Sequence, residues 1–384
     1  MDKLFGGIIG AGKTSFIGFT HRVAANFYNE AEIKSGVFSN NPDECLLRGL
    51  ELGIERDRIY CDYSRMIENE NSLPHENRIE FVIIATRNLL HYNMIKALLE
   101  IGFPVTPDTP MRISLAESVE IKTIQKKTGM VLALTHGYTG YPMIKQARYL
   151  VKSGRLGKII NIIVSYNQGW LSPLINNPQT FKTWHLDPAI SGPSNTMIDI
   201  GTHAINLVQT ITGLIPQRVC ADLESAIPGN QLEDNGTVLI KFNNMVNGLL
   251  HASQVSTGEG NALRIKIYGD KAGLSWDQEF PEVLEMMNSD GTTTIFKKGI
   301  SALCKDALNA SNFPPGHPEG FICAFANIYA AVFKAIRCHK DNQHSCPGGE
   351  SGWDFPGIEE GITGLSFVEA VIKSNQSTDK WIKI

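Results

Sequence analysis

A chain of 384 residues, 42% of them hydrophobic, can bury more than one core, so its length favours two domains. Its formal net charge of −4 offers no basic surface to nucleic acid or to an anionic membrane, which leaves a small solute as the expected partner. The seven cysteines are scattered, no signal segment is recognisable, and no apolar run approaches about 18 residues. We therefore expect a soluble protein of the reducing cytoplasm.

The first third of the chain alternates short apolar runs with segments of helical periodicity. This alternation predicts strand–helix–strand units around a parallel sheet. Ser114 and Glu117 have the spacing of a capping box, so a helix is expected to begin there. The expected strands are 4–9, 33–38, 81–85, 103–106 and 130–134, and the expected helices are 42–52, 91–101 and 114–127. We predict an α/β, doubly wound first domain over residues 1–134.

The pattern changes after residue 134. Several β-like runs follow one another and are joined by short turns such as FNNMVNG, which indicates antiparallel pairing. The expected strands are 159–166, 219–223, 237–242, 246–253, 264–268 and 274–276, and the expected helices are 142–153, 200–212, 318–337 and 358–374. We predict a second, α+β domain over residues 135–384, with a C-terminal helix that can pack back on the first domain.

The segment GIIGAGKTS, residues 7–15, matches two phosphate-binding patterns. The P-loop spacing is met by Gly7, Gly12, Lys13 and Thr14, and the dinucleotide spacing, with serine in third place, by Gly10, Gly12 and Ser15. Residues 8–9 fit the end of a first strand, and the strand at 81–85 lacks the aspartate that a P-loop enzyme needs for magnesium. The dinucleotide pattern is therefore favoured, while a glycine turn that binds nothing stays open.

The end of the second strand bears on the choice of dinucleotide. An acidic residue there would bind the adenosine ribose 2′-hydroxyl of NAD. The chain has Ser39, Asn40 and Asn41 instead, which removes the repulsion of a 2′-phosphate, but no adjacent arginine is present to bind one. The sequence is compatible with NAD or NADP.

Seven stretches, in this order, resemble the Gfo/Idh/MocA oxidoreductases, the family of glucose–fructose oxidoreductase and inositol dehydrogenase. They are GIIGAGKTSFIGFTHR, IIATRNLLH, PDTP, LTHGYTGYPM, WHLDPAISGPSNTMIDIGTH, GHPEGF and WDFPGIEEGI, and they span residues 7–362. The resemblance implies an N-terminal Rossmann domain and a C-terminal domain with an open, largely antiparallel sheet. It also implies a homo-oligomer, a dimer or tetramer formed through that sheet, and NAD(P)-dependent oxidation of a secondary alcohol in a sugar, an inositol or a derivative.

The resemblance also implies cofactor contacts in the first domain. The pyrophosphate would face Gly10, Gly12, Lys13, Thr14, Ser15 and Phe16. The adenosine ribose would lie by Ser39 and Asn40, and the nicotinamide side would be lined by Thr86, Arg87, Asn88 and His91, with Arg87 replacing the proline of the family. The turn that follows the next strand would add Asp108 and Pro110.

Asp199 and His203 in the stretch DIGTH are four residues apart, so they would share one face of a helix start. On spacing alone, an N-terminal aspartate and a core histidine are the plainer interpretation. The resemblance instead implies that His203 accepts the proton of the reacting hydroxyl, while Asp199 binds a substrate hydroxyl or tunes the histidine.

Thr109 stands where the family has a lysine. A hydroxyl can donate a hydrogen bond but carries no charge, and losing such help typically costs about 10²–10⁴ in rate. Ser194 and Asn195 also replace paired glycines of the family. Three accounts therefore stay open: an oxidoreductase in which another group takes the lysine's role, a cofactor-retaining lyase, isomerase or sugar-binding protein, and a P-loop phosphotransferase.

Further candidates for substrate contact are His136, Tyr138, Trp184, His185 and His317. Each is equally compatible with packing or helix capping. The loop 338–346 carries two cysteines and two histidines, but it lacks a Cys-x-x-Cys pair, so we expect no metal site.

Overall fold

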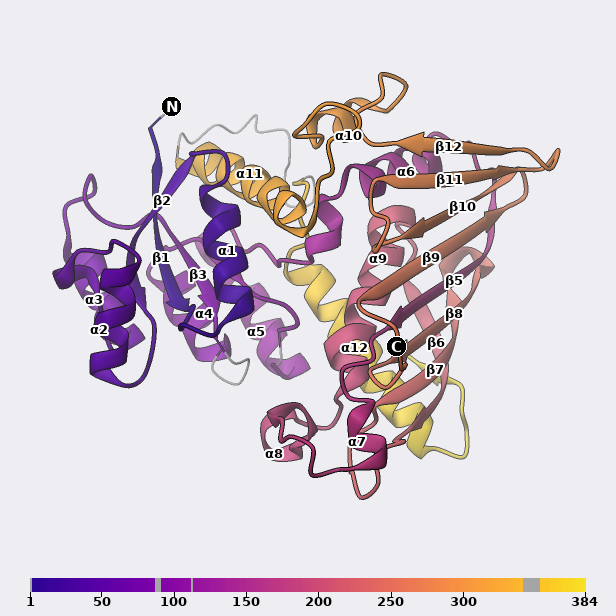
Figure 1. Ribbon diagram of the computed structural model, residues 1–384, viewed down its shortest axis with the longest axis horizontal. Coiled ribbons are helices and arrows are strands. Elements are labelled where there is room, and N and C mark those ends of the chain that lie inside the picture. Colours follow the sequence, from indigo (N-terminus) through magenta and orange to yellow (C-terminus); the bar gives the residue numbers. More distant parts are fainter. Residues whose placement is uncertain (1, 87–90, 112, 341–352) are drawn as a thin grey trace. The chain divides into compact units, whose positions relative to one another are not determined.

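The computed structural model describes residues 2–86, 91–111, 113–340 and 353–384 (Figure 1). The chain divides into two compact units, the first formed by Met1–Gly140 with Phe321–Ile362 and the second by Tyr141–Gly320 with Thr363–Ile384. The predicted boundary lies after residue 134; in the structure the chain leaves the first unit after Gly140 and returns to it at Phe321.

The described part of the first unit contains a four-stranded parallel sheet in the order β2-β1-β3-β4. The strands are β1 (Leu4–Gly10), β2 (Ala31–Val37), β3 (Phe81–Ala85) and β4 (Val105–Pro107). The helices are α1 (Phe16–Asn26), α2 (Pro42–Glu51), α3 (Tyr63–Ser72), α4 (His91–Glu100), α5 (Leu115–Thr128) and α11 (Phe321–Lys340), with short 3₁₀ segments at Arg56–Arg58 and Gly137–Gly140. The predicted α/β Rossmann architecture is confirmed.

Local signals from the sequence account for several of these elements. Ser114 caps α5, and the Glu117 carboxylate accepts from the Ser114 backbone N–H, which confirms the capping box. The predicted strand at 130–134 is wrong, because only an isolated parallel bridge between Val105 and Leu132 forms there.

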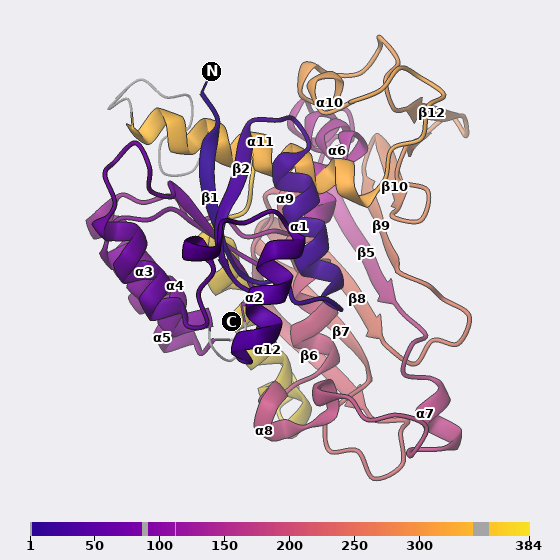
Figure 2. The ribbon, with the colours of Figure 1, turned by 60° about the vertical axis from the view of Figure 1, so that its left-hand side comes forward.

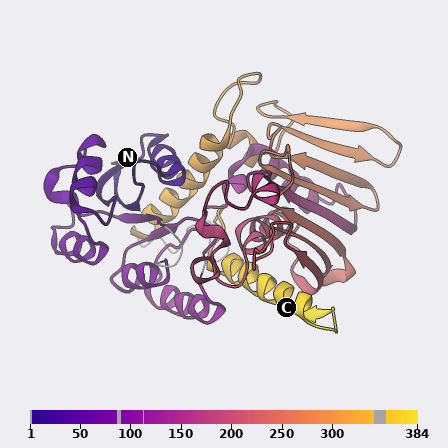
Figure 3. The ribbon, with the colours of Figure 1, turned by 60° about the horizontal axis from the view of Figure 1, so that its bottom comes forward.

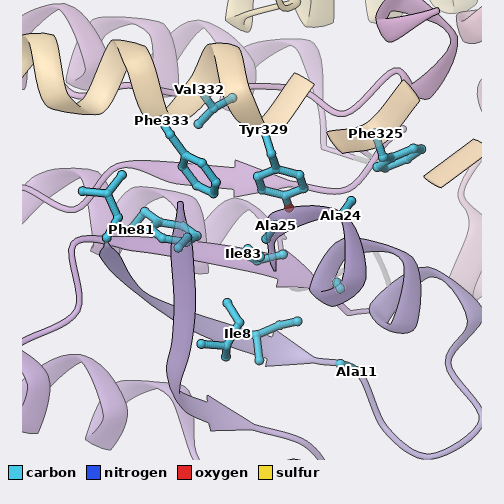
Figure 4. Close-up of a cluster of buried hydrophobic side chains, with 14 of the residues drawn as sticks. Ile8, Ala11, Ala24, Ala25, Phe81, Ile83, Phe325, Tyr329, Val332 and Phe333 are labelled. Carbon is cyan, nitrogen blue, oxygen red and sulfur yellow. The ribbon is translucent and has the colours of Figure 1, made fainter. Parts of the chain in front are cut away.

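Helix α11 supplies a large part of the core of the first unit. Its side chains Phe325, Tyr329 and Phe333 are buried with Phe81 and Ile83 of β3 (Figure 4). The rings of Phe81 and Phe333 lie 5.1 Å apart. Among the described helices, α11 alone is long and apolar enough to cross a membrane by length and composition, with a mean hydropathy of 1.5. Its apolar side chains are used in the core.

The second unit contains, in its described residues, a nine-stranded sheet in the order β12-β11-β10-β9-β5-β8-β7-β6-β13. The strands are β5 (Ile159–Asn167), β6 (Pro216–Glu224), β7 (Asn235–Phe242), β8 (Asn247–Ser253), β9 (Ala262–Gly269), β10 (Ala272–Asp277), β11 (Val283–Asn288), β12 (Thr293–Lys297) and β13 (Ile382–Lys383). Strands β5 and β8 pair parallel, and the other neighbours pair antiparallel. The largely antiparallel sheet predicted from the sequence is confirmed.

Helices cover one face of this sheet. They are α6 (Pro142–Lys152), α9 (Thr202–Thr212) and the part of α12 (Ile358–Gln376) that belongs to the second unit (Figures 2 and 3). Shorter helical segments are α7 (Pro173–Asn176), 3₁₀ at Trp184–Leu186, α8 (Pro188–Ser191), a π-helical turn at Met197–Gly201, 3₁₀ at Asn243–Met245 and α10 (Lys305–Asn309). No described helix lies on the opposite face, so the sheet is open.

Candidate functional site

The glycine loop joins β1 to α1. Strand β1 extends through Gly10, and Gly7 pairs with residues on both neighbouring strands, so the loop itself is only 11–15. A Cβ at Gly7 would lie 2.3 Å from Met66 Cε. This geometry does not suit a P-loop, in which the phosphate cradle would already begin at Gly7.

Two glycines make the close approach of strand, loop and helix possible. Gly10 has a φ of 109°, and a Cβ there would lie 2.3 Å from the Ala85 carbonyl oxygen of β3. A Cβ at Gly18 would lie 2.3 Å from Ala11 Cα, so Gly18 supplies the close helix packing expected of a third glycine. Ser15 instead caps α1, its Oγ accepting from Gly18 N–H at 3.1 Å. The helix thus begins directly behind the loop, as in an anion-binding helix start.

The remaining predicted positions around this loop are mostly at the surface. Lys13, Thr14 and Phe16 are exposed, and Lys13 lies 4.0 Å from Glu51. Beyond β2, Asn40 is exposed and Ser39 Oγ donates to Glu44 Oε2 at 2.9 Å.

Arg48, which lies outside the motifs found in the sequence, contacts the loop. Arg48 on α2 donates from Nε to the Ala11 carbonyl at 3.4 Å and pairs with Glu51 at 3.2 Å. Burial, and then the charge of Arg48, lower the pKa of Arg22 on α1. The surroundings of the loop therefore carry more positive charge than the residues next to it in sequence indicate.

The turn at Asp108 is fixed by a buried histidine. The Tyr329 hydroxyl lies 2.6 Å from His21 Nδ1, and His21 Nε2 lies 3.3 Å from Asp108 Oδ1. Burial, and then the Asp108 charge, raise the pKa of Tyr329 well above its usual value, so its hydroxyl stays protonated and donates. His21 then donates from Nε2 to the carboxylate. The next residue, Thr109, donates to the Thr135 carbonyl at 3.2 Å, and Pro110 is buried.

Two polar side-chain atoms are buried without a partner near the end of β3. Thr86 Oγ1 and His91 Nδ1 are buried and have no hydrogen-bond partner among the described atoms. His91 Nε2 lies 3.2 Å from the Thr86 carbonyl, and burial lowers the pKa of His91, which keeps the ring neutral. Arg87 and Asn88 lie outside the described residues. His136 and Tyr138 are both buried, with their rings 5.8 Å apart.

In the second unit, Asp199 lies within the π-helical turn and His203 lies in the first turn of α9. Asp199 N–H donates to the Asn195 carbonyl at 2.9 Å, and Asp199 Oδ2 accepts from Gln254 Nε2 at 2.8 Å. The Tyr166 ring meets the His203 ring edge-on at 6.2 Å. Burial, and to a lesser extent the Asp199 charge, raise the pKa of Tyr166 to about 12. The structure thus brings both predicted residues to one neutral tyrosine. Single π-helical turns often occur at functional sites.

An aromatic cluster lies beyond Gln254. The rings of Trp184 and His185 stack at 3.7 Å, and Trp170 meets His185 at 5.1 Å. Trp170 Nε1 donates to Gln168 Oε1 at 3.1 Å, and Gln254 Nε2 lies 3.4 Å from the same oxygen. Two of the predicted substrate residues are therefore connected to Asp199 through two carboxamides.

The side chain of His317 is exposed, and its backbone carbonyl accepts a hydrogen bond from Lys298 Nζ at 2.7 Å.

The residues that the structure describes contain no group of three or more His, Cys, Asp or Glu placed to hold a metal ion. Five cysteines are free (Cys45, Cys61, Cys220, Cys304 and Cys323), whereas Cys338 is disulfide-bonded. The cysteines therefore do not identify a reducing compartment.

Comparison with known protein families finds two matches in the chain. Residues 6–136 match "Oxidoreductase family, NAD-binding Rossmann fold", and residues 144–275 match "GFO/IDH/MocA C-terminal domain". The chain belongs to the Gfo/Idh/MocA oxidoreductase family.

Three proteins illustrate what the chain is similar to. An uncharacterized oxidoreductase, YfiI of Bacillus subtilis, is 30% identical over 98% of this chain and 95% of its own. Levoglucosan dehydrogenase of Pseudarthrobacter phenanthrenivorans is 23% identical over 74% of this chain and 76% of its own. The crystal structure of an inositol dehydrogenase homologue of Azotobacter vinelandii, complexed with NADH and myo-inositol, is 26% identical, has a TM-score of 0.90, and is matched over 100% of this chain and 98% of its own.

Proposed function

We propose that this Gfo/Idh/MocA protein is an NAD(P)-dependent oxidoreductase that interconverts a secondary alcohol and a ketone on a sugar, an inositol or a derivative. The observation that carries the proposal is the position of Asp199 in the π-helical turn and of His203 in the first turn of α9, with the Tyr166 ring edge-on to the His203 ring. The similarity to proteins named for levoglucosan and inositol supports a cyclic polyol as substrate.

The residues of the first unit fit a dinucleotide. Gly10, Gly18 and Ser15 set the short loop at the start of α1, and the unpartnered atoms of Thr86 and His91 provide polar groups for the nicotinamide end. A bound nicotinamide would supply the acceptor of a hydride from the substrate carbon. Asp108, held by His21, would fix the turn that carries Thr109.

The residues of the second unit would handle the substrate. His203 would accept the hydroxyl proton as the carbon–hydrogen bond breaks, and would return it in the reverse reaction. The Asp199 carboxylate would accept a hydrogen bond from a neighbouring substrate hydroxyl. Burial raises the pKa of Tyr166 to about 12, so Tyr166 would be protonated near neutrality and would not serve as the base.

A turnover assay tests this proposal. The purified protein is incubated with NAD⁺ or NADP⁺ and a panel of pyranoses, inositols, anhydrosugars and acyclic polyols, and formation of the reduced nicotinamide is followed by absorbance. We expect turnover with at least one cyclic polyol. Tight dinucleotide binding without turnover on any member would support the cofactor-retaining lyase, isomerase or sugar-binding protein. Magnesium-dependent ATP binding that is lost on Lys13→Ala would support a phosphotransferase.

We also propose a homo-oligomer formed through the open sheet. Leu239 on β7, Leu249 on β8 and Ile163 on β5 are register neighbours across the sheet, and Leu239 and Ile163 are 47% and 42% exposed. An apolar row of this kind on an uncovered face is typical of an interface.

The double variant Ile163→Asp, Leu239→Asp is therefore expected to lower the mass in light scattering after size exclusion, from a dimer or tetramer toward the monomer. Val119→Asp, at an exposed apolar position on α5, is the control and should leave the mass unchanged. A monomeric wild type, or a double variant of unchanged mass, would contradict this interface.

The cytoplasm is the expected compartment because it supplies the proposed cofactor.

A further inference from the structure

Ser194 and Asn195 are completely buried before the π-helical turn. Both bind the Glu233 carboxylate, Ser194 through Oγ at 2.5 Å and Asn195 through its backbone N–H at 3.1 Å. Met197 N–H adds a third donor at 3.0 Å. Burial raises the pKa of Glu233, and these donors act in the opposite direction. Glu233 therefore caps the start of the turn that carries Asp199.

Gln254 connects this cap to Asp199. Its side chain is completely buried, and its Oε1 accepts from Asn195 Nδ2 at 2.8 Å and from Thr196 Oγ1 at 3.1 Å. With Oε1 occupied by two donors, the carboxamide has one favoured orientation, and its Nε2 faces Asp199 Oδ2 at 2.8 Å. An amide NH₂ can only donate, so Asp199 meets it as an acceptor.

We propose that Gln254 is a positioning residue for the reaction, which holds the Asp199 carboxylate in one orientation as an acceptor. Asn195 and Thr196 hold Gln254, and Glu233 in turn holds Asn195. The proposal rests on the proposed function, because it acts through Asp199. Its physical basis is that a buried, fully hydrogen-bonded group keeps a catalytic side chain in place at little further entropic cost. Ser194 and Asn195 are then members of one polar network that reaches Asp199.

A double-mutant cycle tests this role. Gln254→Met keeps the length and apolar volume of the side chain but removes the donor. It is expected to lower kcat about 10- to 100-fold, the range for a hydrogen bond to a charged group, with dinucleotide affinity unchanged. In an Asp199→Asn background, the same change is expected to have little further effect, because the two residues act as one unit. Full additivity of the two losses would overturn the proposal.

Gln146→Met is the matched control. Gln146 on α6 is also buried in the second unit, and its Oε1 accepts from Cys304 N–H at 2.8 Å, outside the Asp199 network. Its variant is expected to change thermal stability without changing kcat. Equal losses of kcat in Gln146→Met and Gln254→Met would show a general packing effect and overturn the positioning role.

A second measurement does not depend on turnover. Backbone hydrogen exchange is followed for peptides that cover residues 196–203 in the wild type, Gln254→Met, Gln254→Glu and Gln146→Met. We expect faster exchange in both Gln254 variants, with the larger increase in Gln254→Glu, because a second carboxylate would face Asp199. Unchanged exchange in both would overturn the proposal. A wild type that oxidises no polyol would count against the proposed function, while this exchange measurement would still decide whether Gln254 holds the turn.

Discussion

Replacing His203 with alanine is expected to lower kcat/KM for the best polyol by about 10²–10⁴, the usual range for loss of a general base. His203 lies in the first turn of α9 with its ring against the edge of Tyr166, whose pKa of about 12 prevents it from replacing a lost base near neutrality. Steady-state kinetics and dinucleotide titration by fluorescence measure the effect. Dinucleotide affinity should stay within about twofold, because the loop at α1 is untouched.

His251→Ala provides the control. His251 lies on β8, where its Nδ1 is 3.1 Å from Thr237 Oγ1, and burial lowers its pKa. This variant removes an imidazole from the same unit, yet it should keep most of the turnover. An active His203→Ala enzyme would show that another group accepts the proton.

Introducing lysine at Thr109 is expected to raise kcat by about tenfold or more. The present threonine offers an uncharged hydroxyl that donates to the Thr135 carbonyl at 3.2 Å, whereas an ammonium group would stabilise negative charge on the substrate oxygen. The preceding carboxylate of Asp108 is already held by His21, so the turn that would carry the new side chain is fixed.

Thr109→Met is the matched variant, because it adds length without charge and should not raise kcat. Both variants are compared at saturating dinucleotide, after thermal denaturation has shown that they are folded. If Thr109→Lys leaves kcat unchanged or lowers it, the chemistry does not use the lysine of the family, and the altered family member becomes the better account.

The elements that sequence could predict are those with a local signal. The capping box at Ser114, the strand at β3 and the glycine loop are each encoded within a few residues. Helix α3 was not predicted because it is mostly polar, and its buried Glu70 is paired with Arg58 rather than packed among apolar groups. Strand β12 was not predicted because it lies at the sheet edge and is largely exposed, so its sequence shows no apolar alternation.

The residues of the candidate site were likewise predictable only where the signal is local in the sequence. Asp199 and His203 share one motif, and their common position on a helix start could be expected from their spacing. The groups that orient Asp108 and Asp199 could not be predicted from the sequence. His21 contacts Tyr329, which lies 308 positions away, and Gln254 contacts Asp199, which lies 55 positions away. Such contacts exist only once the fold brings the segments together.

The return of the chain to the first unit has a consequence for biosynthesis. Phe325, Tyr329 and Phe333 complete the core around β3, so the N-terminal sheet leaves the ribosome without part of its apolar cover. Tyr329 also holds His21, and His21 holds Asp108. A nascent chain that stops after the large sheet of the second unit would therefore carry the glycine loop but lack Tyr329. His21 would then not yet be held against Asp108 in the way that the folded structure shows. The turn at Asp108 is in this way completed only after translation has passed Tyr329.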